Sequence, residues 1–410
     1  MERPAGAAGR FARRATGGLP RPFWVLWAGT LVNRLGMFVE PFLALYLSGA
    51  RHLPLTEVGA VLASYGAGSL FSQLIGGALA DRIGRRGTLT AGMLANAAAL
   101  LGLGYARGLG PVVAASVAAG LTIDLYRPAA AALVADLVPA ADRARAYGLI
   151  FWAVNLGFSV AMVAGGTLAR AGFTTLFWVD AATCAMFGLL VWRGVPETLP
   201  AAGRMSSAGR GRAGRESFLA VFADPLFMAF AVIGLLEACV YMQAYTTLPL
   251  AMSRAGLPAQ GFGIAMAVNG LVIVVAQPAT GAWLGHRDHA TVLACGVSFL
   301  GLGFGLTSLA SSVWEYAGCV AVWTVGEILL TNVASVVVAA LAPERLRGRY
   351  SGVFGTTYAL GYLIAPLAGT RLLELGKPVL WLCCAAACAV AVAGQLALGP
   401  AIRRREEVTG

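Results

Sequence analysis

The chain has 410 residues, 58% of them apolar and 12% charged, which is about half of the roughly 25% charge of ordinary soluble domains. This composition excludes a soluble fold, because too little polar surface is present to cover a core. The net charge of +11 does not indicate nucleic-acid binding, because the basic residues fall in short clusters between apolar runs and form no single basic face. We therefore predict an all-α membrane protein in contact with a lipid bilayer.

Apolar runs long enough to cross about 30 Å of hydrocarbon recur along the chain. They predict twelve transmembrane helices, at approximately 22–47, 57–80, 87–105, 111–138, 146–169, 175–195, 224–252, 260–284, 290–310, 314–341, 350–373 and 378–399. With the N-terminus in the cytoplasm, the cytoplasmic segments hold 22 of the 30 lysines and arginines and the opposite loops hold six. This asymmetry predicts that both termini are cytoplasmic.

The first and fourth predicted spans carry ionisable residues near their middle. Arg34 follows Asn33 in the first span, with Glu40 nearer its outer end, and the fourth span contains Asp124 and Arg127. A charge at the bilayer centre costs about 2.5–3.5 kcal/mol and tends to face a cavity or a partner. Asp124 and Arg127 are three residues apart and can pair on one helix face. Arg34 could neutralise Asp124 or Glu40, and a purely structural ion pair is the alternative.

A glycine- and arginine-rich motif follows the second predicted span. It reads Gly77-x-x-x-Asp81-Arg82-x-Gly84-Arg85-Arg86. The small Gly77 permits a close helix approach. Asp81 can accept hydrogen bonds from Arg82 or Arg143, or lie at the positive end of a neighbouring helix. The alternative is that the arginines only set the orientation of the chain.

The fifth and sixth predicted spans precede a break in the pattern. The fifth span carries the small-residue motif Gly157-x-x-x-Ala161-Met162-x-x-Gly165-Gly166. Asp180, near the outer end of the sixth span, is expected at the membrane interface. Residues 198–222 are rich in Gly, Ser and Arg and predict a flexible cytoplasmic linker. It would separate an N-terminal six-helix bundle (1–197) from a C-terminal one (223–410).

The seventh and tenth predicted spans each hold a carboxylate, Glu237 and Glu327, and contain no basic residue. An acidic group without a countercharge is a candidate for a proton carrier or a cation-binding site. The alternative is a protonated carboxyl that forms a hydrogen bond between helices. The eleventh span then carries the motif Gly361-x-x-x-Ala365-Pro366-x-x-Gly369.

The two halves are related by a repeat. A single ungapped offset of 204 residues aligns Pro139 with Pro343, and the pair Arg143 and Arg145 with the pair Arg347 and Arg349. The same offset aligns the glycines of the fifth and eleventh spans. We therefore predict two pseudo-symmetric six-helix bundles, related by an axis along the membrane normal, with a solute path between them.

The motif from Gly77 to Arg86 resembles the G-x-x-x-D-R-x-G-R-R signature of the major facilitator superfamily and matches it at every position. The fifth-span motif is similar to the G-x-x-x-G-P-x-x-G-G motif of drug/proton antiporters, with Ala161-Met162 in place of Gly-Pro. As a whole, the chain looks like the bacterial multidrug-resistance-type branch. The resemblance implies that spans one, four, seven and ten line a central cavity. It also implies a cytoplasmic gating motif that latches the halves, formed by Gly77, Asp81, Arg82, Gly84, Arg85 and Arg86.

These features predict a secondary active transporter that exports small amphipathic or cationic compounds by alternating access, with protons as the coupling ion. The alternative is an importer or uniporter of a small metabolite. We expect a monomer in the bacterial cytoplasmic (inner) membrane, not an enzyme, with no cofactor, metal or nucleic acid. The candidate cavity residues are Arg34, Glu40, Asp124, Arg127, Glu237, Glu327, Asn33, Tyr126, Tyr241 and Asn332. The candidate packing residues of spans five and eleven are Gly157, Gly165, Gly166, Gly361, Pro366 and Gly369.

Overall fold

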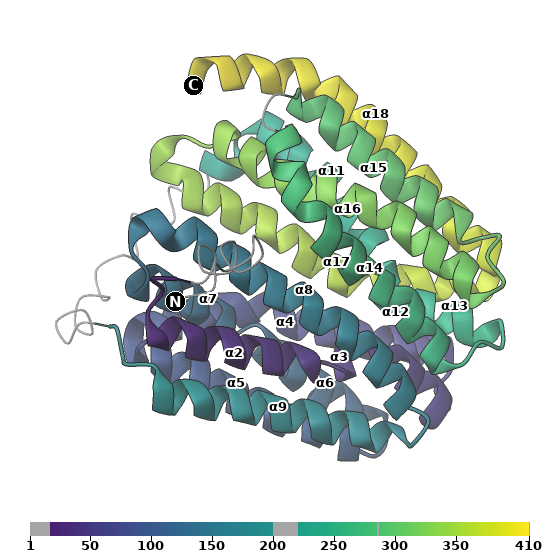
Figure 1. Ribbon diagram of the computed structural model, residues 1–410. Coiled ribbons are helices and arrows are strands. Elements are labelled where there is room, and N and C mark those ends of the chain that lie inside the picture. Colours follow the sequence, from purple (N-terminus) through teal and green to yellow (C-terminus); the bar gives the residue numbers. More distant parts are fainter. Residues whose placement is uncertain (1–16, 200–219, 285–286, 410) are drawn as a thin grey trace, which may run out of the picture.

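The computed structural model describes residues 17–199, 220–284 and 287–409. These residues form helices and their connections, with no strand among them. Most of the predicted linker 198–222 lies outside the described residues, so the linker and the two domain boundaries stay predictions. Figure 1 shows the helices before residue 199 (purple to teal) below the helices after residue 220 (green to yellow).

The helices fall into two groups along the chain. The N-terminal group consists of α2 (Arg21–Leu35), α3 (Val39–Leu45), the π-helical turn η1 (Tyr46–Ala50), α4 (Leu55–Ile83), α5 (Arg85–Tyr105), α6 (Leu109–Ile123), α7 (Tyr126–Leu137), the 3-10 turn η2 (Ala140–Asp142), α8 (Arg143–Leu168) and α9 (Phe173–Gly194). The C-terminal group consists of α11 (Pro225–Tyr241), α12 (Gln243–Thr246), α13 (Leu248–Arg254), α14 (Ala259–Leu284), α15 (His289–Leu306), α16 (Val313–Leu341), the 3-10 turn η5 (Glu344–Leu346), α17 (Arg347–Leu375) and α18 (Lys377–Thr409).

Ten helical segments among the described residues are long and apolar enough to cross a membrane. Helix α2 is not among the ten because it has only 15 residues and ends at Leu35, before α3 begins. Helix α17 is not among them either; it is long, but its middle is less apolar because it contains several Gly, Thr and Tyr residues. A count of twelve, with α2–α3 and α17 added, remains a prediction that agrees with this architecture.

Several spans are interrupted near their middle, where the predicted ionisable residues lie. The first span breaks between α2 and α3, and the fourth breaks at Asp124 and Leu125, between α6 and α7. A break leaves backbone groups without helical partners, which is costly in a membrane. At the first break, Asp180 accepts hydrogen bonds from the backbone N–H groups of Phe38 (3.1 Å) and Val39 (3.0 Å). The expectation of an interfacial Asp180 was wrong, because this side chain is buried and caps α3.

The repeat is visible in the packing of the predicted glycine motifs. A Cβ atom built on Gly157 would lie 2.6 Å from Cβ of Arg34, and one on Gly361 would lie 3.0 Å from Cβ of Ala238. Arg34 and Ala238 are separated by 204 residues (238 − 34), which is the repeat offset. These two glycines therefore let α8 and α17 approach the first helix of their own group.

The other motif glycines also sit at close contacts. A Cβ atom on Gly165 would lie 2.8 Å from the ring of Phe42, and one on Gly369 would meet the side chain of Gln243. Gly166 differs, because its Cβ atom would lie 2.8 Å from Cα of Gln260 in the C-terminal group. The motifs thus serve mainly to pack each group internally, with Gly166 at the contact between groups.

The two groups meet along α4 with α17 and along α8 with α14. A Cβ atom built on Gly66 would lie 2.5 Å from the backbone of Tyr362, and one on Gly59 would lie 2.9 Å from the carbonyl oxygen of Pro366. The rings of Phe42 and Phe262 also touch across the groups, with centroids 5.4 Å apart. All these contacts lie in the halves of the helices that the arginine count places toward the outside.

At the opposite end the described glycines make no close contact with the other group. A Cβ atom built on Gly77, Gly148, Gly352 or Gly355 would meet no neighbouring atom within 4 Å. This end carries the start of α2 and the end of α18 (Figure 1) and is the predicted cytoplasmic side. With that orientation, the arrangement is closed toward the outside and open toward the cytoplasm.

Candidate functional site

A cavity of about 440 Å³ lies between the two groups of helices, and we call it the central cavity. Its volume falls in the roughly 300–1,000 Å³ range of small-molecule sites. Both groups contribute to its lining. Six of the ten predicted cavity residues line it, namely Arg34, Glu40, Asp124, Arg127, Tyr241 and Glu327.

On the N-terminal wall the charges partly pair. Nε of Arg127 lies 2.5 Å from Oδ1 of Asp124, so the predicted pair is present. The Arg34 guanidinium instead donates to the Tyr126 hydroxyl (2.5 Å) and to Sδ of Met37 (2.7 Å). Among the described residues, Arg34 has no carboxylate within 4.0 Å. Arg34 therefore forms no direct ion pair with Asp124 or Glu40, and neutralisation across the cavity stays a prediction.

Glu40 of α3 contacts the opposite wall. Its Oε1 accepts a hydrogen bond from the hydroxyl of Tyr362 on α17. Around the central cavity, this is the one side-chain hydrogen bond that we find between the two groups within the described part of the chain. The remaining cross-group contacts there are glycine and aromatic packing, so this bond is a specific polar tie at the closed end.

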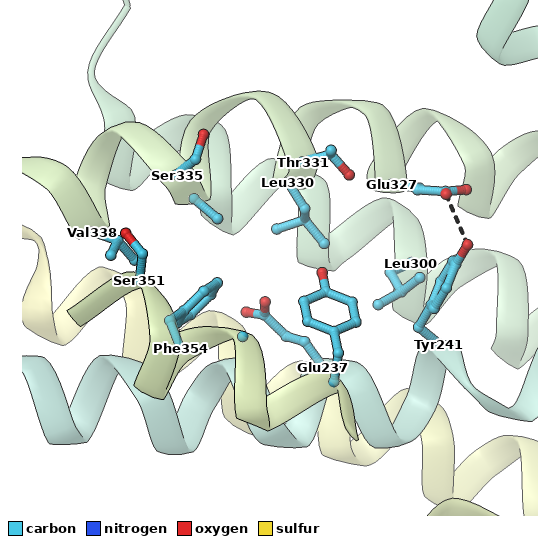
Figure 2. Close-up of a pocket in the computed structure, with 13 residues that line it drawn as sticks. Glu237, Tyr241, Leu300, Glu327, Leu330, Thr331, Ser335, Val338, Ser351 and Phe354 are labelled. Carbon is cyan, nitrogen blue, oxygen red and sulfur yellow. Dashed lines mark hydrogen bonds between the residues drawn. The ribbon is translucent and has the colours of Figure 1, made fainter. Parts of the chain in front are cut away.

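On the C-terminal wall, Glu327 of α16 accepts two hydrogen bonds, one at each oxygen. The donors are the Tyr241 hydroxyl (2.8 Å) and Nδ2 of Asn269 (2.6 Å). Figure 2 shows the Tyr241 side chain directed at Glu327. No arginine or lysine lies within 4.0 Å of Glu327 among the described residues. Glu327 is thus held as a hydrogen-bond acceptor at the cavity wall without a cationic partner.

A second cavity of about 380 Å³ lies inside the C-terminal group, and we call it the side chamber. Tyr241, Glu327, Gly355 and Tyr358 line both cavities. Glu237 of α11 projects into the side chamber (Figure 2), and the rest of the lining is mostly apolar. Oε1 of Glu237 accepts a hydrogen bond of 3.0 Å from Nε2 of Gln395.

Three predicted cavity residues lie elsewhere. Asn33 donates to Sγ of Cys184 (3.2 Å) and, with Tyr126, lines a separate pocket of about 20 Å³, too small for an organic solute. Asn332 accepts from Nε2 of Gln277 (3.1 Å) and donates to the backbone of Ile328, and it lies on neither cavity lining. Asn332 therefore joins α14 to α16, and its placement at a cavity was wrong.

Sequence reasoning missed many residues around the two cavities, and those with notable polar side chains include Tyr65, Tyr358, Tyr362 and Gln395. The repeat offset could have identified three of them, because it aligns each of the three tyrosines with another cavity residue. It aligns Tyr65 with Asn269, Tyr358 with Val154 and Tyr362 with Phe158, and all six of these residues line the central cavity. Nothing in the pattern points to Gln395, which lies in an apolar stretch of α18.

The cytoplasmic motif is organised by Glu197, a residue outside it. The Glu197 carboxylate accepts from the backbone N–H groups of Arg85 (2.9 Å) and Gly87 (3.4 Å). Gly84 adopts a φ of +99°, and a Cβ atom there would collide with this carboxylate. Burial raises the pKa of Glu197, but hydrogen bonds from backbone N–H groups outweigh it, so the pKa is lowered.

The arginines of the motif contact only the N-terminal group. Nε of Arg85 lies 3.3 Å from Oδ2 of Asp136, and the Arg86 guanidinium lies 4.7 Å from the ring centre of Trp192. Asp81 is exposed and is paired with neither Arg82 nor Arg143. Its expected pairing was wrong, and within the described residues the implied latch to the other half is not formed.

Comparison with known proteins gives the same fold and family. The model for the Major Facilitator Superfamily matches residues 26–366 and 244–407. A crystallised POT family transporter in complex with 5-aminolevulinic acid superimposes with a TM-score of 0.80 at 17% identity, covering 94% of this chain and 98% of that one. The nucleoside transporter NupG superimposes with a TM-score of 0.79 at 14% identity, covering 92% and 99%. At such identities the structural likeness shows the fold alone.

Curated relatives match over most of their length. The uncharacterized MFS-type transporter YqjV of Bacillus subtilis is 25% identical over 369 residues, covering 87% of this chain and 88% of the relative. A Na(+), Li(+), K(+)/H(+) antiporter of Planococcus maritimus is 25% identical, covering 82% and 86%. The multidrug resistance protein MdtH of Escherichia coli is 24% identical, covering 75% of each chain. The chain therefore belongs to the Major Facilitator Superfamily and is a multi-pass membrane transporter of small molecules, not an enzyme.

Proposed function

We propose that this protein exports small amphipathic cations across the bacterial cytoplasmic membrane in exchange for protons. The observation that carries the proposal is Glu327, an acidic group on the wall of the central cavity with no cationic partner among the described residues. In a site shielded from bulk water, a fixed carboxylate of this kind favours a cation strongly. Two relatives support cation exchange and drug export by their names, an alkali-cation/proton antiporter and a multidrug resistance protein.

The transport cycle follows from the two-group arrangement. In the state described here the central cavity is closed at the Glu40–Tyr362 tie and open at the predicted cytoplasmic end. A cargo cation enters from the cytoplasm and binds near Glu327. The two groups then rock, so that the cytoplasmic ends meet and the outer ends separate, which is the alternating access of paired six-helix repeats. A proton bound from the outside competes with the cargo for the acidic groups and returns the protein to this state.

A second candidate is an importer or uniporter of a small metabolite, working as a monomer in the same membrane. It is favoured by one observation, Ala161-Met162 in the fifth span where the antiporter motif has Gly-Pro. The same cavity serves both functions, because direction is set by the coupling ion and not by the scaffold.

The test uses inside-out membrane vesicles and a fluorescent lipophilic cation such as ethidium. With an acidic lumen, the wild-type protein should accumulate the dye at least several-fold over vesicles without the protein, and an uncoupler should abolish the gain. Glu327→Gln should remove most of the accumulation. The matched control is Glu374→Gln, which removes a carboxylate paired with Arg371 at the outer end of α17 and should leave transport unchanged. Dye entry that only equilibrates the concentrations and does not respond to the uncoupler would favour the uniporter.

A further inference from the structure

Next to Glu237 of the side chamber lies a buried hydrogen-bond acceptor that lacks a donor. Gln395 of α18 is 1% exposed, and its Nε2 donates to Oε1 of Glu237 at 3.0 Å. Its Oε1 is buried and has no hydrogen-bond partner. Buried carbonyl oxygens are almost always satisfied, so an exception of this kind calls for a physical explanation. The titratable group in contact with Gln395 is the Glu237 carboxyl.

The surroundings of Glu237 disfavour its charged form. No arginine, lysine or histidine lines the side chamber. The titratable groups around Glu237 are the Cys388 thiol from α18, the Tyr358 hydroxyl from α17, the Glu327 carboxyl from α16 and the Tyr241 hydroxyl from α11 itself. Helix α15 contributes only the apolar Leu300. An anion here would have one amide donor and no countercharge, which is an expensive state in an apolar cavity.

A protonated Glu237 resolves both problems together. A carboxylic acid can donate its O–H to the amide oxygen of Gln395 while its carbonyl oxygen accepts from Nε2, so that the pair forms a ring of two hydrogen bonds. The donor that Gln395 lacks is then supplied by Glu237 itself.

Glu327 presents the opposite situation. Both of its oxygens accept from donors, one from Tyr241 and one from Asn269, so it is satisfied as an anion without a proton. It also lines the central cavity, whereas Glu237 lines only the side chamber. The two carboxyls thus differ both in hydrogen bonding and in access to a solute.

We propose that Glu237 is the proton-carrying group, that Gln395 is the positioning residue that holds its protonated form, and that Glu327 binds the positive charge of the cargo. This division of roles rests on the proton exchange proposed above. In the state described here, Glu237 carries the proton brought from outside. When cargo arrives, the O–H bond of Glu237 breaks, the proton passes to water through the chamber mouth, and a carboxylate remains to collect the next proton.

Infrared spectroscopy of the purified protein tests the proton directly, because a protonated carboxyl has a carbonyl band distinct from that of a carboxylate. The wild-type protein at neutral pH should show such a band, shifted by deuterium oxide. Glu237→Gln should remove it, and Glu327→Gln should leave it. Gln395→Leu should move it to higher wavenumber, because the hydrogen bonds to the carbonyl are lost. A band that persists in Glu237→Gln would overturn the assignment.

Transport by reconstituted protein gives a second, independent readout. Glu237→Gln should lose accumulation driven by a pH gradient, by tenfold or more, yet keep exchange of labelled for unlabelled cargo. Glu237→Asp keeps an acid and should retain proton drive with a shifted pH profile, and Gln395→Leu should shift the profile as well. Proton drive that survives Glu237→Gln would refute this inference while the proposed function stands. If the wild-type protein shows no proton drive, the proposed function fails, and the infrared band still decides whether Glu237 holds a proton.

Discussion

Glu197 connects the end of α9 to the start of α5 through backbone groups alone. It accepts from the N–H groups of Arg85 and Gly87 and from those of Thr198 and Leu199. We expect Glu197→Ala to lower the free energy of unfolding by about 1.5–3 kcal/mol, the range for hydrogen bonds to charged groups. The loss should appear as a lower melting temperature in detergent. Glu344→Ala is the control, because it removes an exposed carboxylate from η5 and should change little.

The same residue gives a pH dependence with a definite sign. The pKa of Glu197 in the folded protein lies below its ordinary value of 4.5. Stabilisation by the carboxylate is therefore fully present above pH 4.5 and is lost as pH falls toward the lower, folded-state pKa. We expect the difference in melting temperature between wild type and Glu197→Ala to shrink in acid. A difference that stays constant from pH 7 to pH 3 would show that the charge of Glu197 is not responsible.

At this scale, the sequence predicted where charges lie better than it predicted their partners. Arg34 and Glu327 lie in the middle of apolar spans, which is visible in the sequence, and this position predicted that they line a cavity. The partners of Arg34 and Glu40 were not predictable, because Tyr126 and Tyr362 lie 92 and 322 residues away. Asp180 was misplaced for the same reason, since the break that it caps lies in another span.

The interface of α4 and α17 depends on the absence of a side chain at Gly66, which faces the backbone of Tyr362. We expect Gly66→Val to prevent this approach and to shift the protein toward the arrangement that is open outward. Gly77→Val, on the same helix, meets no neighbour in the present arrangement and should not produce that shift. The check is maleimide labelling of Gly352→Cys from the cytoplasmic side, in a background where the exposed Cys295 and Cys383 are replaced by alanine.

In this experiment, Gly66→Val should reduce the labelling rate several-fold, because the cytoplasmic ends would close around residue 352. Equal labelling in Gly66→Val and wild type would show that α4 and α17 can separate slightly without moving the two groups. A fall in labelling in Gly77→Val alone would contradict the orientation of the whole arrangement.

Small-residue motifs predicted close helix contacts, but not which helices would meet. Gly157 and Gly361 pack against the first helix of their own group, while Gly59 and Gly66, outside any predicted motif, contact the other group. The reason is that helix packing through glycine depends on the face that each glycine occupies, and the membrane gives both faces a similar apolar environment. Sequence spacing alone cannot separate an internal contact from one between groups.

For the molecule as a whole, the Glu40–Tyr362 tie contributes to the balance between two arrangements. Tyr362→Phe removes one hydrogen bond, worth about 0.5–1.5 kcal/mol, so the closed outer end should lose population by about two- to tenfold. Spin labels on Gly148→Cys and Gly352→Cys, at the open cytoplasmic ends, would report the change as a larger fraction of short distances. Tyr358→Phe is the control, because the Tyr358 hydroxyl lies at both cavities and, within the described residues, forms no hydrogen bond between the groups.

An unchanged distance distribution in Tyr362→Phe would show that packing alone closes the outer end. The six-and-six order of spans stays a prediction, whereas the repeat was visible in the sequence, because it follows from a single offset. The end at which the cavity opens was not, because a transporter sequence must permit both arrangements and therefore favours neither strongly.

The carboxyls of Glu237 and Glu327, which lack cationic partners among the described residues, also determine whether transport is driven by the pH gradient, by the membrane potential or by both. If Glu237 takes one proton inward for each monovalent cation that leaves Glu327, no net charge crosses the membrane in a cycle. Such an electroneutral exchange does not depend on the membrane potential. Its driving force is the pH difference across the membrane, which supplies about 1.4 kcal/mol per proton for each pH unit. A doubly charged cargo would instead have to move against the inside-negative potential, at about 2.3 kcal/mol for every 100 mV.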